Sequence, residues 1–393
     1  MKLAVVGFGN AGGKIADRIV EYETKTERSL CQFTAVVNSA RIDLQKLSYV
    51  PQRHQVLVGQ TDERSKGHGA GADPDLGAEL TRQDLSEVQR ILDNVPLHDV
   101  DAFLVIAGLG GGTGSGGGPV FAEALGERYG EPVYGLGVLP SSDEGGRASL
   151  NAARSIRSFV DATDATIAFD NDAWREGTQS IESGYEQTNL EIAKRVVALL
   201  APGEYDGSPV SENAMDSSDV KRTLSVGGVA TVAYAEASLE SETQRQRGLL
   251  GRLRNDEDPG REREGAATKV HGLVRRAARS RLTCPADIAS AERAVVVVSG
   301  PPSELSQKGL VRARKWLESQ IDSVEVLAGD DPRPAADRLR ATVLLANATD
   351  VPRIDALQTQ AVDARENIEA QAAERETAIS ELVTDPDDEL DPI

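Results

Sequence analysis

The sequence has only two cysteines, Cys31 and Cys284, and they are far apart. They match neither a disulfide framework nor the ligand spacing of a metal site, so we predict no metal centre and a reducing compartment, the cytoplasm. Basic residues are also scarce: 63 acidic residues stand against 43 basic ones, and the formal net charge is −20. Because positive patches bind phosphate backbones, nucleic acid is not an expected partner. Such an acidic surface fits a protein kept soluble in concentrated salt.

Long apolar runs are missing as well. No run approaches the ~18 residues that a membrane-spanning helix needs. The N-terminal strand, residues 3–6, meets Gly7 too soon to form the core of a signal peptide. We therefore expect a soluble chain without a targeting segment. Its 393 residues exceed what one hydrophobic core usually supports, which predicts two domains.

Glycine, in contrast, is concentrated between residues 108 and 118, where eight of eleven residues are glycine. The run follows an apolar strand, 102–107, and precedes a helix-like segment, 120–125. Glycine held rigid costs backbone entropy, so the cluster indicates a backbone that closely approaches a ligand, most naturally an anion at a helix N-terminus. No lysine follows the glycines, which excludes a Walker A loop. A flexible linker is the plain alternative, but apolar elements flank the run tightly.

Read as GGGTGSG, this run resembles the signature loop of the tubulin/FtsZ superfamily, which cradles the phosphates of GTP. The resemblance implies that GTP or GDP is bound here, with Mg²⁺ carried by the nucleotide. The residues that it assigns to the nucleotide from this loop are Gly110, Gly111, Gly112, Thr113 and Gly114.

A second glycine motif, residues 7–12, stands between the first strand and a helix over 14–22. Its GxGxxG spacing alone indicates a dinucleotide site, so a dinucleotide-dependent enzyme is the alternative from another class. That fold places an acid after the second strand, yet here strand 33–37 ends in Asn38. The second glycine-rich loop, 108–118, is also surplus to that fold. The superfamily resemblance accounts for the missing acid and for the second loop. It assigns to the nucleotide Gly9, Asn10, Ala11, Gly12, Gly13, Lys14 and Asn38.

Three further segments extend the resemblance. Residues 67–74 resemble the third FtsZ nucleotide loop, although alone they would be a mobile glycine loop; Asp73 would there help to hold Mg²⁺ through water. After strand 132–140, Glu144 matches the FtsZ glutamate that contacts the ribose. Arg147 matches an arginine of the same FtsZ segment, but it stands one position earlier than in FtsZ. At the end of the strand near residue 170, Asn171 matches the FtsZ asparagine that binds the sugar and base. The implied residues are Gly71, Ala72, Asp73, Glu144, Arg147 and Asn171.

A helical pattern over 180–200 carries Tyr185 and Asn189 on one face, since they lie four residues apart. An aromatic ring can stack on a purine, and an amide can hydrogen-bond to the edge of guanine. Such a pair is more often packing, but it matches the central helix of the superfamily. The preference for guanine rests on that match.

Two carboxylates, Asp216 and Asp219, lie three apart at a helix start. They resemble the FtsZ synergy loop, which enters the pocket of the next subunit and polarises the attacking water. The plain alternative is an N-cap and a first-turn acid. The resemblance implies a GTPase site shared between subunits, hence a head-to-tail filament.

We therefore predict an α/β fold: a Rossmann-like GTPase domain with a parallel sheet, a long central helix and a smaller α+β C-terminal domain. In the second domain, apolar runs at 226–233, 294–298 and 341–346 predict strands, and 302–320 and 334–339 are helix-like. The predicted division is a GTP-binding domain 1–179, a central helix 180–202, an α+β domain 203–353, and an acidic helix with a disordered tail 354–393.

The first loop resembles tubulin and the acidic pair resembles FtsZ, a mixture typical of CetZ, the archaeal tubulin-like family associated with cell shape. The tail lacks the adaptor peptide with which FtsZ usually ends, which disfavours the main alternative, an FtsZ that forms a division ring. A GTP-binding regulator that never polymerises is a third possibility. The basic stretch 245–281 is an ordinary solvated face or a contact with an acidic neighbouring filament or an anionic membrane. A membrane or envelope adaptor is a further candidate partner of the chain.

Overall fold

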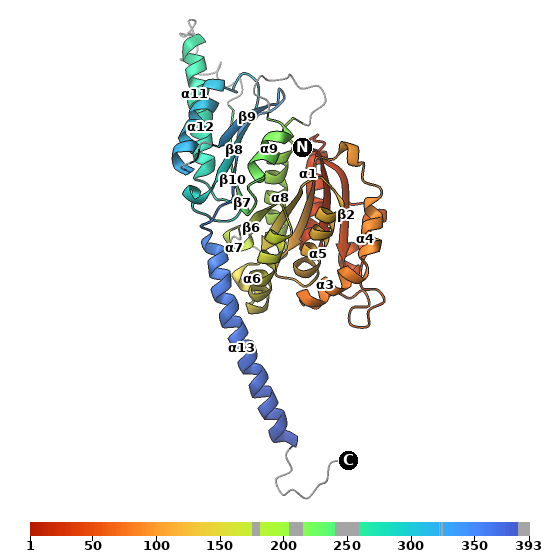
Figure 1. Ribbon diagram of the computed structural model, residues 1–393. Helices are drawn as coiled ribbons and strands as arrows, with labels where there is room; N and C mark the ends of the chain where they lie inside the picture. The colour runs from red at the N-terminus through yellow and green to blue at the C-terminus, as the bar shows by residue number, and fades with distance from the viewer. Residues whose placement is uncertain (175–180, 204–214, 240–258, 322, 324, 384–393) are drawn as a thin grey trace, which may run out of the picture.

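A computed structural model describes residues 1–174, 181–203, 215–239, 259–321, 323 and 325–383. Within them, ten strands form one sheet in the order β3-β2-β1-β4-β5-β6-β7-β10-β8-β9 (Figure 1). The strands are β1 (Leu3–Phe8), β2 (Cys31–Asn38), β3 (Gln55–Leu57), β4 (Ala102–Gly108), β5 (Val133–Leu139), β6 (Ala165–Asp170), β7 (Val229–Ser238), β8 (Arg293–Gly300), β9 (Val326–Pro332) and β10 (Arg338–Ala346).

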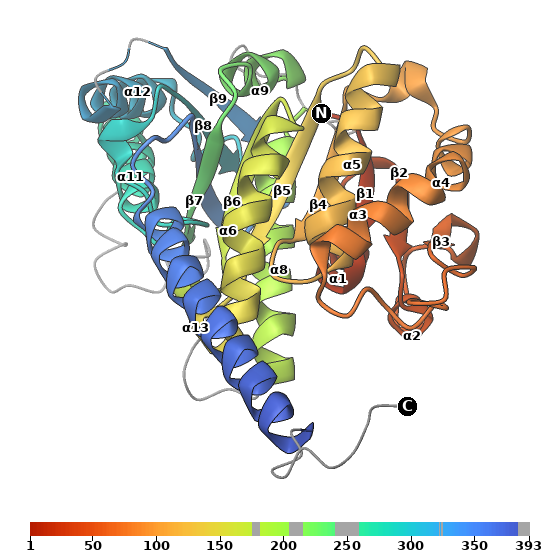
Figure 2. The ribbon, with the colours of Figure 1, turned by 60° about the horizontal axis from the view of Figure 1, so that its bottom comes forward.

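The first half of the sheet, from β3 to β6, is parallel. Strands β1, β5 and β6 are buried along their whole length, as strands covered on both faces must be, which is why the sequence reads as short continuous apolar runs. One face packs against α1 (Gly9–Lys25) and α8 (Ile181–Leu200). The other packs against α5 (Thr113–Arg128) and α6 (Gly146–Asp161), with α3 (Pro74–Gln83) and α4 (Leu85–Leu92) beside them (Figure 2).

The second half of the sheet continues the first. Strand β7 pairs with β6 in parallel through two residue pairs, Thr166 with Val229 and Ile167 with Ala230. Strand β10 is antiparallel to both β7 and β8, and β9 is parallel to β8. Helices α11 (Pro259–Ala278) and α12 (Gln307–Ile321) cover one face, and α8 and α9 (Ser217–Leu224) the other. The predicted α/β class is therefore confirmed, and the two predicted domains share one sheet.

One helix prediction was wrong. Residues 334–339 are not helical: they form a turn that leads into β10 at Arg338. The segment is too short to make a helix by itself, and its last two residues, Arg338 and Leu339, join the ladder to β7 as strand.

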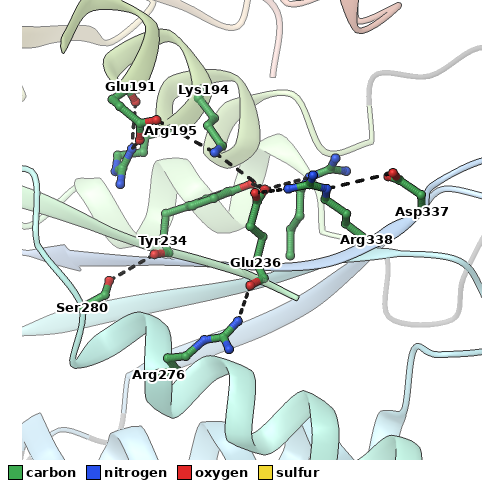
Figure 3. A network of polar contacts seen from close by, with 10 residues as sticks. Glu191, Lys194, Arg195, Tyr234, Glu236, Arg276, Ser280, Asp337 and Arg338 are labelled. Carbon is green, nitrogen blue, oxygen red and sulfur yellow. Dashed lines mark hydrogen bonds and ion pairs between the residues drawn. The ribbon is translucent and has the colours of Figure 1, made fainter. Parts of the chain in front are cut away.

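Helix α8 stands between the two halves and is tied to the C-terminal strands by charges (Figure 3). Glu236 of β7 accepts a hydrogen bond from Tyr234 Oη at 3.0 Å and pairs with Lys194 of α8 at 3.6 Å. Arg338 of β10 also pairs with Glu236. One residue along α8, the Arg195 guanidinium lies over the Trp174 ring, 4.1 Å from its centroid. The helix that carries Tyr185 and Asn189 is therefore fixed to both halves of the molecule.

The C-terminal helix, α13 (Pro352–Val383), is longer than any other described element. It runs antiparallel to α6, since Gln360 lies beside Ser149 and Ala364 beside Gly146. Every described side chain from 365 to 380 is exposed, and Figure 1 shows this part projecting away from the body. The predicted acidic helix is present; the predicted disordered end, 384–393, lies outside the described residues. Within those residues no helix is long and apolar enough to cross a membrane.

Candidate nucleotide-binding site

A cavity of about 430 Å³ opens where the carboxyl ends of β1, β2, β4, β5 and β6 meet the start of α8. This is the edge at which parallel sheets commonly bind ligands, because the loops after successive strands converge there. Most residues predicted from the sequence line it: Gly9, Asn10, Ala11, Lys14, Asn38, Gly71, Ala72, Gly110, Gly111, Gly112, Thr113, Gly114, Glu144, Asn171, Tyr185 and Asn189.

Two helix N-termini meet at this cavity, those of α1 at Gly9 and α5 at Thr113. Neither helix has an acidic residue in its first turn, and Lys14 adds a positive charge. The two loops touch, since a Cβ on Gly9 would lie 3.0 Å from Gly114 N. Backbone amides, two positive helix ends and a lysine form an environment suited to a phosphate chain.

The glycines of residues 108–118 have two structural roles, one at the cavity and one in helix packing. Helix α5 begins at Thr113, earlier than the segment 120–125 that looked helical in the sequence, so the later glycines lie inside it. A Cβ on Gly116 would stand 1.9 Å from Pro74 O of α3, whereas one on Gly111 would meet nothing within 4 Å. The first glycines face the cavity, and the later ones let α5 pack closely on α3.

Two predicted glycines of the first motif do not line the cavity. A Cβ on Gly12 would lie 2.2 Å from the carbonyl oxygen of Ile106, and one on Gly13 would lie 2.8 Å from a methyl of Val36. Both are buried. They let α1 lie directly on β4 and β2, which is a packing role and brings the start of α1 to the cavity.

Asp73 and Arg147 do not line the cavity either. The Asp73 carboxylate caps α3, accepting hydrogen bonds from the amides of Asp75 at 2.9 Å and Leu76 at 3.2 Å. Arg147 lies in the first turn of α6 with an exposed side chain. The capping role of Asp73 is explained by Pro74 at the first position of α3, since an Asp before such a proline is a typical N-cap.

Sequence reasoning missed several lining residues, among them Asp43 and His68. Asp43 lies in α2 (Arg41–Leu44), directly after β2. The turn depends on Asn38, whose Oδ1 accepts a hydrogen bond from Ala40 N at 3.1 Å, and Ala40 pairs with His68 in a β-bridge. The available signal was the place of these residues: Asp43 comes shortly after the strand that ends in Asn38, and His68 lies inside the glycine loop 67–74.

The cavity is also lined by side chains that can bind a sugar and a base. Glu144 is held by a hydrogen bond from Ser141 N to its Oε1 at 2.8 Å. Asn171, which follows β6, is buried. Tyr185 and Asn189 reach the cavity from α8, one turn apart. The lining therefore includes an aromatic ring, two amides and a carboxylate, a set of side chains that suits a nucleoside.

The two acidic residues lie at the other edge of the sheet. Helix α9 is anchored at the amino end of β4: Ser217 Oγ and Lys221 Nζ contact Asp101 Oδ1 at 3.4 and 3.2 Å. Since the cavity follows the carboxyl end of β4, a strand of seven residues, the two sites are separated by roughly 20 Å or more at ~3.3 Å per residue. Figure 1 shows α9 near the N-terminus, at the end of the body away from the projecting α13.

Asp216 and Asp219 form a capping box at the start of α9. Asp216 accepts hydrogen bonds from Ser218 Oγ, Ser218 N and Asp219 N, and these donors lower the pKa of its carboxyl. Partial burial raises the pKa of Asp219. Asp219 is therefore the better proton acceptor of the two.

Comparison with known proteins agrees with this architecture. Residues 2–179 match the GTPase domain of the tubulin/FtsZ family, and residues 178–363 match the C-terminal domain of tubulin-like CetZ. The tubulin-like protein CetZ1 of Haloferax volcanii is 49% identical over 372 residues, 94% of each chain. A solved structure titled CetZ1 from Haloferax volcanii, GDP bound monomer, superposes with a TM-score of 0.81 at 45% identity, covering 93% of this chain and all of that one.

A second solved structure, titled CetZ2 from Haloferax volcanii, GTPγS bound protofilament, also gives a TM-score of 0.81, at 36% identity over 94% of this chain and all of that one. The parallel sheet, the glycine loops at its carboxyl edge and the central helix define a GTPase of the tubulin/FtsZ superfamily. Within that superfamily, the chain belongs to the tubulin-like CetZ family.

Proposed function

We propose that this protein binds GTP and GDP in the cavity and assembles head to tail, so that the next subunit completes each hydrolytic site. The observation that carries the proposal is the separation of the two halves: the cavity lies at the carboxyl edge of the sheet and the Asp216–Asp219 pair at the amino edge. Each monomer then has two incomplete half-sites on opposite ends. Stacking unites them, and such a contact propagates into a filament.

Relatives support both parts of the proposal. One related structure contains GDP, and another is a protofilament with a GTP analogue. We assign the glycine loops and Lys14 to the phosphates, Glu144 and Asn171 to the sugar, and Tyr185 and Asn189 to guanine. Gly12, Gly13, Asp73 and Arg147 would support or flank this site without contacting the nucleotide.

Hydrolysis needs a water held in line with the terminal phosphate. Asp219 of the incoming subunit would accept the proton of that water. Asp216, at the same helix start, would hold Asp219 in place. Within the described residues no group of three or more His, Cys, Asp or Glu side chains could hold a metal, so Mg²⁺ would enter on the phosphates, whose charge it neutralises. The Asp43 carboxylate lines the cavity and suits the water shell of that ion.

As a member of the CetZ family the protein would serve the control of cell shape from the cytoplasm, by way of a membrane or envelope adaptor. A division-ring role stays the alternative. The basic stretch 245–281 lies partly outside the described residues, and in α11 it alternates with acids such as Glu264, which pairs with Lys308 at 2.7 Å. We do not assign the adaptor to it.

The test is GTP hydrolysis measured against protein concentration in high-salt buffer. We expect the rate to rise faster than linearly, and to be lost in Asp219→Ala and in Asn189→Ala. An equimolar mixture of the two variants should recover part of the rate, because a subunit with an intact cavity then meets one with an intact Asp219. Asp363→Ala, on the exposed face of α13, is the control and should match the wild type.

A rate per molecule that is independent of concentration, with Asp219→Ala still active, would mean a self-contained site and exclude the shared one. Tight GTP binding without sedimentation or light scattering would instead support the regulator that never polymerises.

A further inference from the structure

Arg353 is a buried arginine outside the residues discussed so far. It lies in the first turn of α13 and is 9% exposed, although arginine is rarely buried unless it is paired. Its Nε donates to Asp170 Oδ1 at 3.0 Å, and its Nη2 donates to the carbonyl oxygen of Pro140 at 2.7 Å. One guanidinium thus bonds two segments that lie 183 and 213 residues away in the chain.

Both segments contribute to the lining of the cavity, one through Pro140 and the other through Asn171. Pro140 follows β5 and lines the cavity. Asp170 is the last residue of β6 and directly precedes Asn171. Where the β5–β6 ladder ends at the pair Leu139 and Asp170, Arg353 therefore bridges the loop that leads to Glu144 and the strand end that carries Asn171.

A chain of hydrogen bonds continues from this pair. Asp170 Oδ1 accepts from Asp172 N at 3.1 Å, and Asp172 Oδ1 accepts from Ser142 N at 3.0 Å and from Ser142 Oγ at 2.8 Å. Ser142 is next to Ser141, whose amide holds Glu144. These bonds link a residue of the C-terminal helix to the segments that carry Glu144 and Asn171.

We propose that Arg353 is a positioning residue for the nucleotide: by bonding Pro140 and Asp170 together it holds Glu144 and Asn171 at the spacing that the sugar and base require. This inference rests on the proposed function, which assigns the cavity to a guanine nucleotide. Arginine suits the task because it donates from two nitrogens held in one rigid plane, whereas the donors of lysine all rotate about a single nitrogen.

The chain offers a matched control pair. Arg28 Nη2 bonds Asp331 Oδ2 at 2.7 Å, and Arg28 Nη1 donates to the carbonyl oxygen of Ala201 at 3.3 Å. The side-chain exposures are 11% and 4% for this pair, against 8% and 4% for Arg353 and Asp170. Arg28 lies before β2, at the amino edge of the sheet and away from the cavity. The two pairs share chemistry and burial but not location.

The experiment compares Arg353→Lys with Arg28→Lys by calorimetric titration of the monomer with GDP and with 2′-deoxy-GDP, alongside thermal unfolding without nucleotide. Both variants should unfold at a lower temperature than the wild type. Only Arg353→Lys should lose GDP affinity, by about tenfold, the effect of one well-placed hydrogen bond. The preference for GDP over 2′-deoxy-GDP should also shrink in Arg353→Lys alone, which a purely structural loss would not produce.

Should Arg353→Lys fail to fold, the double variant Arg353→Met with Asp170→Asn leaves no lone buried charge and should show the same loss of affinity. Equal GDP affinity in the wild type and in the folded Arg353 variant overturns the inference, as does an equal loss in Arg28→Lys. A wild type that does not bind GDP overturns the proposed function instead, so the two failures are distinguishable.

Discussion

At the scale of single residues, glycine is needed in the first loop for two different reasons, backbone conformation and close packing. Gly9 has a positive φ of 69° at the cavity, a conformation that other residues adopt only with strain. Gly12 has ordinary backbone angles, but no side chain fits between α1 and β4. A single glycine motif thus combines residues that face the cavity with residues that bring the helix onto the sheet.

We predict that Gly12→Ala lowers the free energy of unfolding by about 1–3 kcal/mol, the usual effect of overpacking, because its Cβ would lie 2.2 Å from Ile106 O. Gly126→Ala is the control. It is exposed in α5 with nothing within 4 Å of a new Cβ and should raise that free energy by about 0.5–1 kcal/mol. Denaturant unfolding measures both, and equal effects in the two variants would contradict the packing role.

Asp216 caps α9, so Asp216→Ala should cost about 1 kcal/mol of unfolding free energy, whereas Asp216→Asn, which can still cap, should cost less. Hydrogen bonds from Ser218 and Asp219 lower the pKa of Asp216 in the folded state. The contribution of its charge is therefore complete above the unfolded pKa of about 3.9 and is lost as pH falls through the lower folded pKa.

The difference between the wild type and Asp216→Ala should accordingly be constant between pH 5 and 8 and shrink below about pH 3.9. Thermal unfolding across this range measures it. GTP hydrolysis by Asp216→Asn separates the two roles of the residue: normal activity would leave capping as its function, and a loss with stability retained would make it part of the shared site.

At the scale of elements, α13 has two parts with opposite surroundings. Up to Ala364 it packs on α6, with Leu357 fully buried. Beyond that point all described side chains are exposed, including Ile368 at 46%. The reason is geometric: α6 begins at Gly146, and α13 runs past that end.

We predict that a chain ending at Arg365 keeps the unfolding free energy of the wild type to within about 0.5 kcal/mol, the range of surface changes. Leu357→Ala should lower it by about 2–5 kcal/mol through loss of buried contacts and the cavity left behind. Thermal and urea unfolding of the two variants give the comparison. A large loss on truncation would show that the exposed part makes contacts that stabilise the fold.

At the scale of the whole molecule, the large negative net charge affects the stability of the folded state. A net charge of −20 on 393 residues produces self-repulsion in the compact state that salt screens, with a Debye length of about 10 Å at 0.1 M and about 3 Å at 1 M. We predict that the unfolding temperature rises steadily with KCl from 0.1 to 2 M. A parallel series in sucrose, which is uncharged, controls for general stabilisation by cosolutes, and a flat response to KCl would contradict the electrostatic account.

The parallel half of the fold and most of the cavity could be predicted because their signals are local. Short apolar runs mark strands that are buried on both faces, and the ligand loops directly follow those strands in the chain. Helix α8 was predicted at 180–202 and runs from Ile181 to Leu200, since its apolar residues repeat with helical spacing. The family resemblance rests on these same segments, and the comparisons confirm it.

Other features depend on contacts between distant residues. The fold decides what lies beside each of these residues. It places Gly12 against a carbonyl and not a ligand, and Asp73 at a helix start as a cap. It also brings the end of segment 334–339 into the sheet. The bond from Arg353 to Pro140 spans 213 residues. The sequence by itself determined the strands, the loops and the chemistry they can offer, because these arise from neighbouring residues. Only the tertiary structure decided the single continuous sheet, the separation of the acids from the cavity and the contact of α13 with the cavity wall, because these arise from packing.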